Sequence, residues 1–168
     1  VELLTMLTLN SERTWRIKNE VKAHFGLGPP FGDDPFEWYD ASANEKSYTG
    51  MYDDRFVFNI DGTFKHLTGG TVFAFEEYIN NDIGSSGIDA NERGEIDHYP
   101  LEDYSENWTL SAPGGQETLS LSGTGFISFY VGGNHKYRIL TRSDNEMTLS
   151  TTEGDEEFEW GFVLVAVD

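Results

Sequence analysis

The chain has 168 residues, of which 30 are acidic and 11 are basic, so its formal net charge is -19 at pH 7. We expect no nucleic-acid partner, because nucleic-acid binding depends on Lys and Arg side chains that neutralise phosphates. An acidic surface suits a neutral partner, such as an uncharged polysaccharide, or a cation, such as calcium. The absence of cysteine excludes disulfides, thiol catalysis and zinc–thiolate sites.

The sequence begins Val1-Glu2, without an initiator Met or a basic leader, which indicates a mature fragment excised from a larger secreted protein. Its longest apolar run, at residues 162–167, is far shorter than the roughly 20 residues that span a bilayer, so we expect no direct membrane insertion. No repeat or composition shift marks a linker. The prediction is therefore a single domain over residues 1–168.

The expected elements begin with a short helix, because the first ten residues carry apolar side chains at a helical spacing. Runs of alternating apolar and polar residues then predict half-buried antiparallel strands. These runs cover residues 14–18, 55–60, 63–67, 107–112 and 117–122, followed by four more toward the C-terminus. Asp61-Gly62, between two of them, is typical of a two-residue hairpin turn.

Eight to ten strands with almost no helix predict an all-β fold. The pattern is compatible with an antiparallel sandwich and with an up-and-down, lipocalin-like barrel, and both remain open. Two long loops, residues 19–54 and 76–106, interrupt the regular strand spacing. Loops longer than about 15 residues are uncommon unless they bind something or are disordered, and the aromatic residues in both argue against disorder.

Large apolar residues alternate with polar ones along the expected strands, which predicts that they form the core. They are Trp15 with Ile17, Phe56 with Phe58 and Ile60, Trp108 with Leu110, and Phe158 with Trp160, Phe162 and Leu164. Because these side chains point inward, we do not expect them to contact a ligand.

The aromatic residues of the two long loops follow no such alternation, and they are Phe36, Trp38, Tyr39, Tyr48, Tyr52, Tyr99 and Tyr104. Two interpretations stay open: these rings close the ends of the barrel, or they bind a ligand. A sugar ring has an apolar face that stacks on Trp or Tyr, and its hydroxyls bond to carboxylates and amides. The segment PFEWYD, residues 35–40, offers both kinds of group.

We therefore expect a rigid carbohydrate-binding platform in this segment, with its entry angle fixed by Pro35. The flat faces would come from the aromatic rings, and the carboxylates would bond to hydroxyls. The candidate residues are Phe36, Glu37, Trp38, Tyr39 and Asp40, with Tyr99 and Tyr104 from the second long loop as the opposite wall.

Residues 89–97 resemble the start of a calcium-binding loop, with Asp89, Asn91 and Asp97 as candidate ligands. Arg93 stands at the fifth ligand position and Pro100 at the twelfth, where a bidentate Glu closes such a site. Calcium is therefore a candidate cofactor with an incomplete motif.

Signatures of catalysis are missing from the sequence, which contains no G-x-S-x-G, no H-E-x-x-H and no phosphate-binding glycine loop. Its four His residues show no metal-ligand spacing. With 30 carboxylates, some pairs reach glycosidase distance by chance. We expect that the protein is not an enzyme.

Several segments together resemble a known family: SERTWRI, HFGLGP, MYDDRFVFNIDGTF, GFISFYVGGNHKYRILTRSDNEMTL and FEWGFVLV. They look like a module of Bacteroidetes polysaccharide-utilisation proteins, which is appended to family 16 glycoside hydrolases or found in surface glycan-binding proteins. The similarity covers most of the chain. The opening Trp, the D-G-T-F hairpin and the final Y-R-I-L and M-T-L also resemble lipocalin-like domains of the same bacteria.

This resemblance implies a non-catalytic carbohydrate-binding module for a neutral polysaccharide, with a β-1,3-glucan such as laminarin as the first candidate. It implies an extracellular or outer-membrane location and a monomeric module tethered to other domains. Two alternatives remain open. A lipocalin-like carrier of a small ligand needs an interior lined with small side chains, but large inward rings predict a filled barrel. A structural or partner-docking domain would bury the loop rings against itself.

Overall fold

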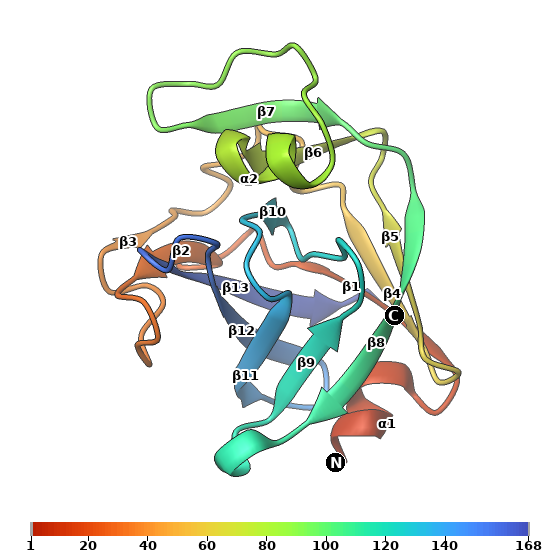
Figure 1. The fold of residues 1–168 in the computed structure, drawn as a ribbon. Helices are drawn as coiled ribbons and strands as arrows, with labels where there is room; N and C mark the ends of the chain where they lie inside the picture. Colours follow the sequence, from red (N-terminus) through yellow and green to blue (C-terminus); the bar gives the residue numbers. More distant parts are fainter. Residues whose placement is uncertain (1, 168) are drawn as a thin grey trace.

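A computed structural model describes residues 2–167 and shows a closed barrel of eight antiparallel strands. The barrel strands are β1 (Glu12–Ile17), β4 (Arg55–Asn59), β5 (Thr63–Leu67), β8 (Tyr104–Ser111), β9 (Thr118–Leu121), β11 (Lys136–Arg142), β12 (Glu146–Thr152) and β13 (Glu159–Ala166). Each pairs with the next, and β1 pairs with β13 to close the barrel (Figure 1). The predicted all-β fold is confirmed, and it is a lipocalin-like barrel.

The two ends of the barrel are covered differently (Figure 1). The predicted leading helix is α1 (Leu3–Thr8), and it lies at the lower end in this view. The upper end carries α2 (Glu76–Asp82) and a second sheet of three strands, β6 (Thr71–Phe75), β7 (Glu95–Pro100) and β10 (Phe129–Tyr130). A 3-10 turn, Pro113–Gly115, precedes β9.

Apolar side chains that alternate along β1 pack against α1 and close the lower end of the barrel. Trp15 and Ile17 are fully buried, and the indole Nε1 of Trp15 donates a hydrogen bond to the carbonyl oxygen of Leu7 at 3.1 Å. Helix α1 itself buries Met6 and Leu7. The guanidinium of Arg13 lies 4.9 Å from the centroid of the Trp15 ring. One strand and one helix therefore share a buried contact around a single indole.

Aromatic rings fill the interior of the barrel. The largest side chains that are fully buried include Trp15, Phe56, Phe58, Phe64, Tyr137 and Phe162. Neighbouring rings from adjacent strands are in contact, with centroids 5.3 Å apart for Phe58 and Phe64. A carrier of the lipocalin type needs interior space for its ligand. The packing of these rings does not favour that alternative.

Some expectations for individual residues were wrong. Ile60 is exposed, because β4 ends at Asn59 and the side chain lies on the hairpin. Tyr99 and Tyr104 do not belong to a loop, since they lie in β7 and β8. The hairpin itself is confirmed: Gly62 has a φ of +97°, and the Asp61 carboxylate accepts the backbone N–H of Thr63 at 2.9 Å.

The two long loops also contain regular structure that the sequence pattern did not predict. The first carries β2 (Phe25–Gly28) and β3 (Tyr39–Asp40), and the second carries α2 and β7. Strand β2 pairs with the N-terminal half of β13, while β1 pairs with its C-terminal half. Strand β3 then pairs with β2. The first loop is thus attached to the wall of the barrel as an extension of the sheet.

Glycines on β2 and β13 allow the segment 34–39 to lie flat on this part of the sheet. A Cβ atom at Gly26 would lie 2.2 Å from the carbonyl oxygen of Tyr39. One at Gly161 would lie 2.8 Å from Cε1 of Phe36 and equally close to Pro35. Such distances are shorter than any van der Waals contact, so larger residues here would push the segment away from the sheet.

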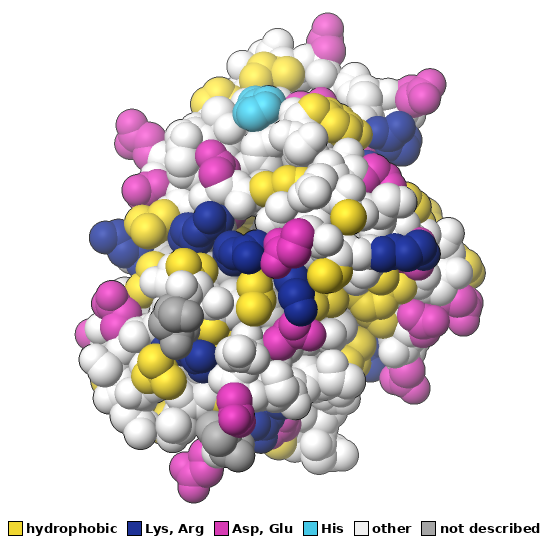
Figure 2. Space-filling model, turned by 180° about the vertical axis from the view of Figure 1, so that it is seen from behind, with side chains coloured by type: hydrophobic (Ala, Val, Ile, Leu, Met, Phe, Trp, Pro, Cys, Tyr) yellow, Lys and Arg dark blue, Asp and Glu magenta, His cyan; other side chains and the backbone are white. Residues whose placement is uncertain are grey.

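Basic side chains are not spread evenly over the surface. Figure 2, seen from behind, shows Lys and Arg side chains gathered in a band across the middle of one face, with Asp and Glu side chains mostly around it. The local charge of a site can therefore differ from the net charge of the chain. Over residues 2–167, no helix is both long enough and apolar enough to cross a membrane.

Candidate functional site

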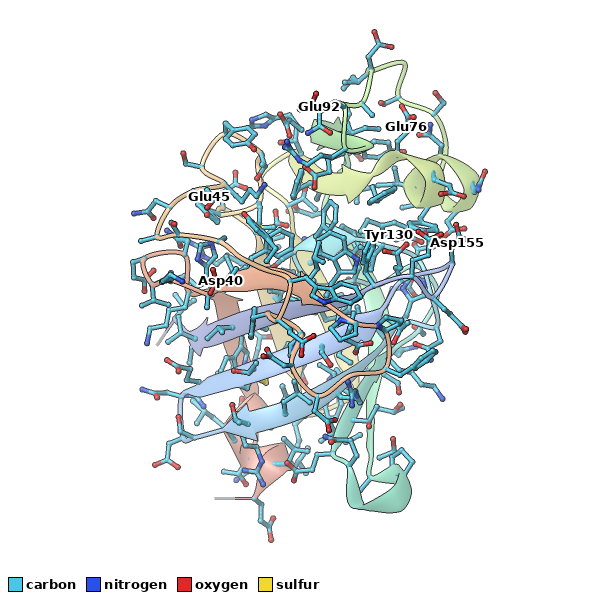
Figure 3. All side chains as sticks on the ribbon, turned by 90° about the vertical axis from the view of Figure 1, so that its left-hand side faces the viewer. Asp40, Glu45, Glu76, Glu92, Tyr130 and Asp155 are labelled. Atoms are coloured by element: carbon cyan, nitrogen blue, oxygen red, sulfur yellow. The ribbon has the colours of Figure 1, made fainter. Side chains whose placement is uncertain are left out.

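A cavity of about 450 Å³ lies where the segment 38–48 meets β2, β13 and the start of β7. Its volume is within the range of small-molecule sites. Figure 3 shows Asp40 and Glu45 on the first long loop and Glu92 above them, on the segment that precedes β7. The lining residues are Phe25, Leu27, Trp38, Tyr39, Glu45, Lys46, Tyr48, Arg93, Glu95 and Trp160. We call this space the aromatic cavity.

Trp38 is the most exposed ring of the aromatic cavity, with 54% of its surface accessible. Its backbone N–H donates to the carbonyl oxygen of Leu27 at 3.0 Å, which fixes the main chain to β2. The ring of Phe158 stands edge-on to it, with centroids 6.1 Å apart. The indole is therefore braced by a neighbour while most of it faces solvent.

Trp160 forms a second, rigid part of the lining. It is almost completely buried and stacks on Phe25, with centroids 5.6 Å apart and planes at 19°. Its Nε1 donates to Oε1 of Glu153 at 3.1 Å. The alternation of β13 correctly predicts Trp160 as a core residue, and the structure shows that this core residue also borders the aromatic cavity.

Tyr39 and Glu45 form a hydrogen-bonded pair in the lining. The Tyr39 hydroxyl donates to Oε2 of Glu45, and Oε1 of Glu45 accepts the backbone N–H of Ser42 at 2.9 Å. Burial and the hydrogen bond to Glu45 both raise the pKa of Tyr39. Burial raises the pKa of Glu45, but the hydrogen bonds from Tyr39 and Ser42 lower it, and the net direction is down. Glu45 is therefore an anionic acceptor with two donors already bound.

The second long loop contributes Arg93 and Glu95. The Nε of Arg93 lies 3.1 Å from Oε1 of Glu95, which also accepts a hydrogen bond from Nδ2 of Asn91 at 3.2 Å. Glu95 raises the pKa of Arg93 through its charge and this hydrogen bond. Both long loops thus reach the same cavity, as the sequence predicts, although Arg93 and Glu95 take the place expected for two tyrosines.

Of the seven predicted carbohydrate-binding residues, the aromatic cavity includes two, Trp38 and Tyr39. Phe36 turns toward the sheet, where it packs at Gly26 and Gly161 and supports the platform. The carboxylate of Asp40 binds Nζ of Lys22 at 2.9 Å. Glu37 is exposed and lies outside the lining.

Tyr99 and Tyr104 also lie outside the lining and point to other parts of the fold. The Tyr99 hydroxyl donates to the carbonyl oxygen of Gly84 at 2.6 Å, and the residue is buried. The Tyr104 hydroxyl lies 2.8 Å from Nδ1 of His66, inside the upper part of the barrel. The opposite wall is therefore not built from these two rings.

Of the predicted calcium ligands, Asn91 has another role in the fold. The side-chain oxygen of Asn91 accepts the backbone N–H groups of Arg93 and Glu95 at 2.9 and 3.0 Å, so it closes a turn. Asp89 is exposed, and burial raises the pKa of Asp97. Within residues 2–167, no group of three or more His, Asp or Glu side chains is arranged to hold a metal ion.

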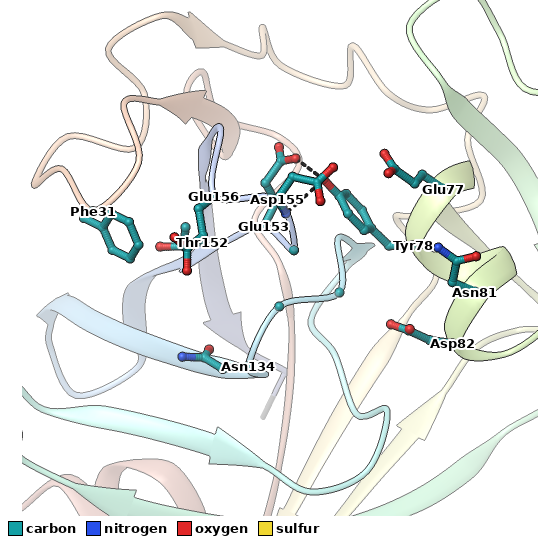
Figure 4. Close-up of a pocket in the computed structure, with 13 residues that line it drawn as sticks. Phe31, Glu77, Tyr78, Asn81, Asp82, Asn134, Thr152, Glu153, Asp155 and Glu156 are labelled. Atoms are coloured by element: carbon teal, nitrogen blue, oxygen red, sulfur yellow. Dashed lines mark hydrogen bonds between the residues drawn. The ribbon is translucent and has the colours of Figure 1, made fainter.

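A second cavity, of about 440 Å³, lies between α2 and the turn after β12 (Figure 4). Glu77, Asn81 and Asp82 come from α2, and Phe31 stands on the opposite side. The hydroxyl of Tyr78 donates to Glu153, the same carboxylate that accepts from Trp160, and burial raises the pKa of this Glu153. A buried carboxylate therefore links the two cavities.

A buried polar cluster lies beneath the second sheet. His66 and Asp54 are almost completely buried, with Nε2 of His66 3.2 Å from Oδ2 of Asp54, although the two atoms are not aligned as a hydrogen bond. Burial lowers the pKa of His66 to about 3 and raises that of Asp54 well above 3.8. Both directions describe a pair that burial keeps uncharged.

The sequence pattern missed Lys46, Arg93, Glu95 and Trp160 as site residues. Trp160 lies at the start of β13, where a core residue also borders the loops at the end of the barrel. The sequence pattern alone predicts only its place in the core. Lys46 stands in the segment NEKSY, which contains nothing to distinguish it from a solvated residue. No protein-family model matches the chain, and no curated protein matches it either.

Proposed function

We propose that this domain is a non-catalytic carbohydrate-binding module and that a sugar ring occupies the aromatic cavity. Trp38 supports this proposal most directly. Its indole is more than half exposed, yet its main chain is bonded to Leu27 and its ring is braced by Phe158. A flat, pre-organised aromatic face is the group that stacks on the apolar face of a pyranose.

The rest of the lining supplies the other requirements of a sugar. Tyr39 and Tyr48 add aromatic surface, and Glu45, Arg93 and Glu95 add hydrogen-bonding groups of both kinds. Carbohydrate ligands need this mixture, because each hydroxyl both donates and accepts while the ring carbons remain apolar.

The ligand that the net charge favours is a neutral polysaccharide, and a β-1,3-glucan such as laminarin is the first candidate. The sequence resemblance supports a setting in a Bacteroidetes polysaccharide-utilisation protein, outside the cell or on the outer-membrane surface. In that setting the domain acts as a monomeric module that holds glycan near other domains.

Titration of the isolated domain with laminarin, mixed-linkage glucan, agar and alginate tests the proposal. Isothermal calorimetry and tryptophan fluorescence should give a saturable change with one glycan, and Trp38→Ala should remove it. Incubation with the same glycans should release no new reducing ends. Release of reducing ends that a single Asp or Glu substitution abolishes would contradict the non-catalytic part.

A further inference from the structure

Lys46 is a buried cation in the lining of the aromatic cavity, with only 6% of its surface accessible. Its Nζ lies 5.5 Å from the ring centroid of Tyr39, 6.0 Å from that of Tyr48 and 5.9 Å from that of Phe73. Tyr39 and Tyr48 line the cavity, and Phe73 belongs to the core beneath it. Three rings therefore lie within about 6 Å of the ammonium, which still reaches the solvent in the cavity.

This ammonium has no oxygen partner within residues 2–167: no ion pair or hydrogen bond of its Nζ exists there. Lys is almost never this buried without one. The two carboxylates of the lining are bound elsewhere, since Glu45 accepts from Tyr39 and Ser42, and Glu95 accepts from Arg93. The charge of Lys46 acts through space on Asp97 and Glu45, where it favours a lower pKa of each carboxyl group, and neither carboxylate is hydrogen-bonded to it.

The three rings stabilise the charge but do not satisfy its hydrogen bonds. Cation–π contacts within about 6 Å offset part of the cost of burial. An ammonium also has three N–H donors, and the Nζ of Lys46 is not among the buried polar atoms shut off from solvent, so these donors face the open aromatic cavity. A ligand that brings an anionic oxygen into the aromatic cavity would satisfy both the charge and the donors.

We propose that Lys46 is the anchor for an acidic substituent, a carboxylate or a sulfate ester, on the sugar that occupies the aromatic cavity. The chemistry shared by the two substituents is an oxyanion next to an apolar ring face. The compact ammonium of Lys binds either shape, because it lacks the planar fork with which Arg selects carboxylates.

The inference rests on the proposed function, keeps its site, and changes its ligand from a wholly neutral glycan to one that carries an acidic substituent. The net charge of -19 repels long polyanions, but exposed charges are largely screened beyond about 8 Å at physiological ionic strength. In the lining of the aromatic cavity, Arg93 is paired with Glu95, and Glu45 already accepts from Tyr39 and Ser42. Lys46 is the lining cation without such a pair among the described residues, and the inference assigns the acidic group to it.

A matched pair of ligands tests the inference: a laminari-oligosaccharide, and the same oligosaccharide with its primary alcohols oxidised to carboxylates. A 6-O-sulfated oligosaccharide forms the third arm. We expect at least one acidic form to bind about tenfold or more tightly than the neutral form, because hydrogen bonds to charged groups are the stronger ones. Lys46→Met should abolish this preference, and raised salt should weaken it.

Lys46→Met keeps the length and apolar character of the side chain. Its backbone contacts do not depend on the ammonium: the N–H donates to Tyr52 at 2.8 Å, and the carbonyl accepts from Thr49. We expect an unchanged or raised melting temperature, since replacing a buried charge with an apolar side chain is often stabilising. If Lys46→Met does not fold, Lys46→Gln serves in its place.

Three results separate the inference from the proposed function. Equal affinity for neutral and acidic oligosaccharides, or a preference that survives Lys46→Met, overturns the inference while the module still binds glycan. Binding of any arm that Trp38→Ala does not weaken overturns the proposed site. A preference for the carboxylate or for the sulfate alone, lost in Lys46→Met, supports the inference and identifies the substituent.

Discussion

The ring of Phe158 meets the indole of Trp38 edge-on, with centroids 6.1 Å apart and planes at 89°. Edge-to-face pairs of this kind contribute about 0.5–1.5 kcal/mol beyond the area that they bury. The two ring planes are nearly perpendicular, and 54% of the surface of Trp38 stays accessible beside this contact. Phe158 comes from the turn before β13, so the barrel itself orients a ring of the first long loop.

Trp38→Ala should weaken glycan binding at least roughly thirtyfold, because a pre-organised aromatic anchor often contributes about 2 kcal/mol or more. The thermal transition should stay within a few degrees, since the side chain is more than half exposed. Calorimetric titration beside a thermal melt measures both. Tyr39→Ala should have a smaller effect on affinity.

Phe31→Ala is the matched control for this substitution. Phe31 lies in the same long loop, has 64% of its surface accessible and lies outside the aromatic cavity. Its removal should leave the affinity of a short oligosaccharide unchanged. Suppose instead that Trp38→Ala bound glycan with unchanged affinity and melted at a much lower temperature. Trp38 would then be a structural residue that covers the end of the barrel, and the ligand would bind elsewhere.

Trp15→Ala should lower the free energy of unfolding by about 3–5 kcal/mol, because it removes a large buried aromatic side chain. It also removes the hydrogen bond to Leu7 that joins β1 to α1. Since small domains have only about 5–15 kcal/mol of stability, much of the fold depends on this side chain. Urea unfolding measures the loss, and an unchanged midpoint would show that the indole is not a core element.

Tyr104→Phe should reduce stability by about 1–3 kcal/mol without changing glycan affinity. The hydroxyl lies 2.8 Å from Nδ1 of His66 and accepts the backbone N–H of Phe126 at 3.3 Å, and its loss leaves buried polar groups unpaired. Chemical unfolding and glycan titration of the same sample separate the two effects. A loss of affinity with unchanged stability would place Tyr104 in the binding site after all.

The Asp54–His66 pair predicts a specific pH dependence. In the folded protein the pKa of His66 is lowered from 6.5 to about 3, so His66 stays neutral at pH values at which the unfolded residue binds a proton. The contribution of His66 to the free energy of unfolding therefore falls as the pH drops below 6.5. Folded Asp54 has its pKa raised well above 3.8, so its contribution falls as pH rises above 3.8. Between about pH 4 and 6, the proton sits on His66 in the unfolded chain and on Asp54 in the folded protein. The number of bound protons is then the same in both states, so the stability of the parent protein does not change with pH on account of this pair.

Single substitutions should therefore reveal opposite slopes. In Asp54→Asn, the free energy of unfolding relative to the parent should rise with pH by about 1.4 kcal/mol per pH unit between about pH 4 and 6. In His66→Gln it should fall with pH over the same interval. Urea unfolding of the three proteins at several pH values measures both slopes. Curves parallel to the parent would mean that burial does not hold this pair uncharged.

The all-β fold could be predicted because apolar alternation and turn residues are visible within short stretches of the sequence. Alternation along 63–67 and the Asp61-Gly62 turn describe a hairpin without reference to the rest of the chain. The same local alternation wrongly places Ile60 in the core, because Ile60 continues the pattern of β4 but lies beyond its last paired residue. The choice of a barrel over a sandwich depends on the pairing of β1 with β13, which no local pattern contains.

The site was predictable only in part, for the same reason. Of the residues of PFEWYD, Trp38 and Tyr39 line the aromatic cavity, and their contact with a glycan stays a prediction. Phe36 was misassigned, since its contact with Gly161 joins two distant parts of the sequence. Lys46, Arg93 and Glu95 become a site only when the two long loops meet, which is a tertiary fact.

Strand β13 pairs with β2 along its N-terminal half and with β1 along its C-terminal half, and both pairings join segments far apart in the sequence. Phe25 pairs with Phe162, so the strand that carries the first long loop has its partner near the opposite end of the described chain. Contacts so remote in sequence are slow to form, because a long loop must close before they contribute. During synthesis the aromatic cavity would remain incomplete until β13 has emerged, because Trp160 and the pairing partner of β2 both lie in that strand.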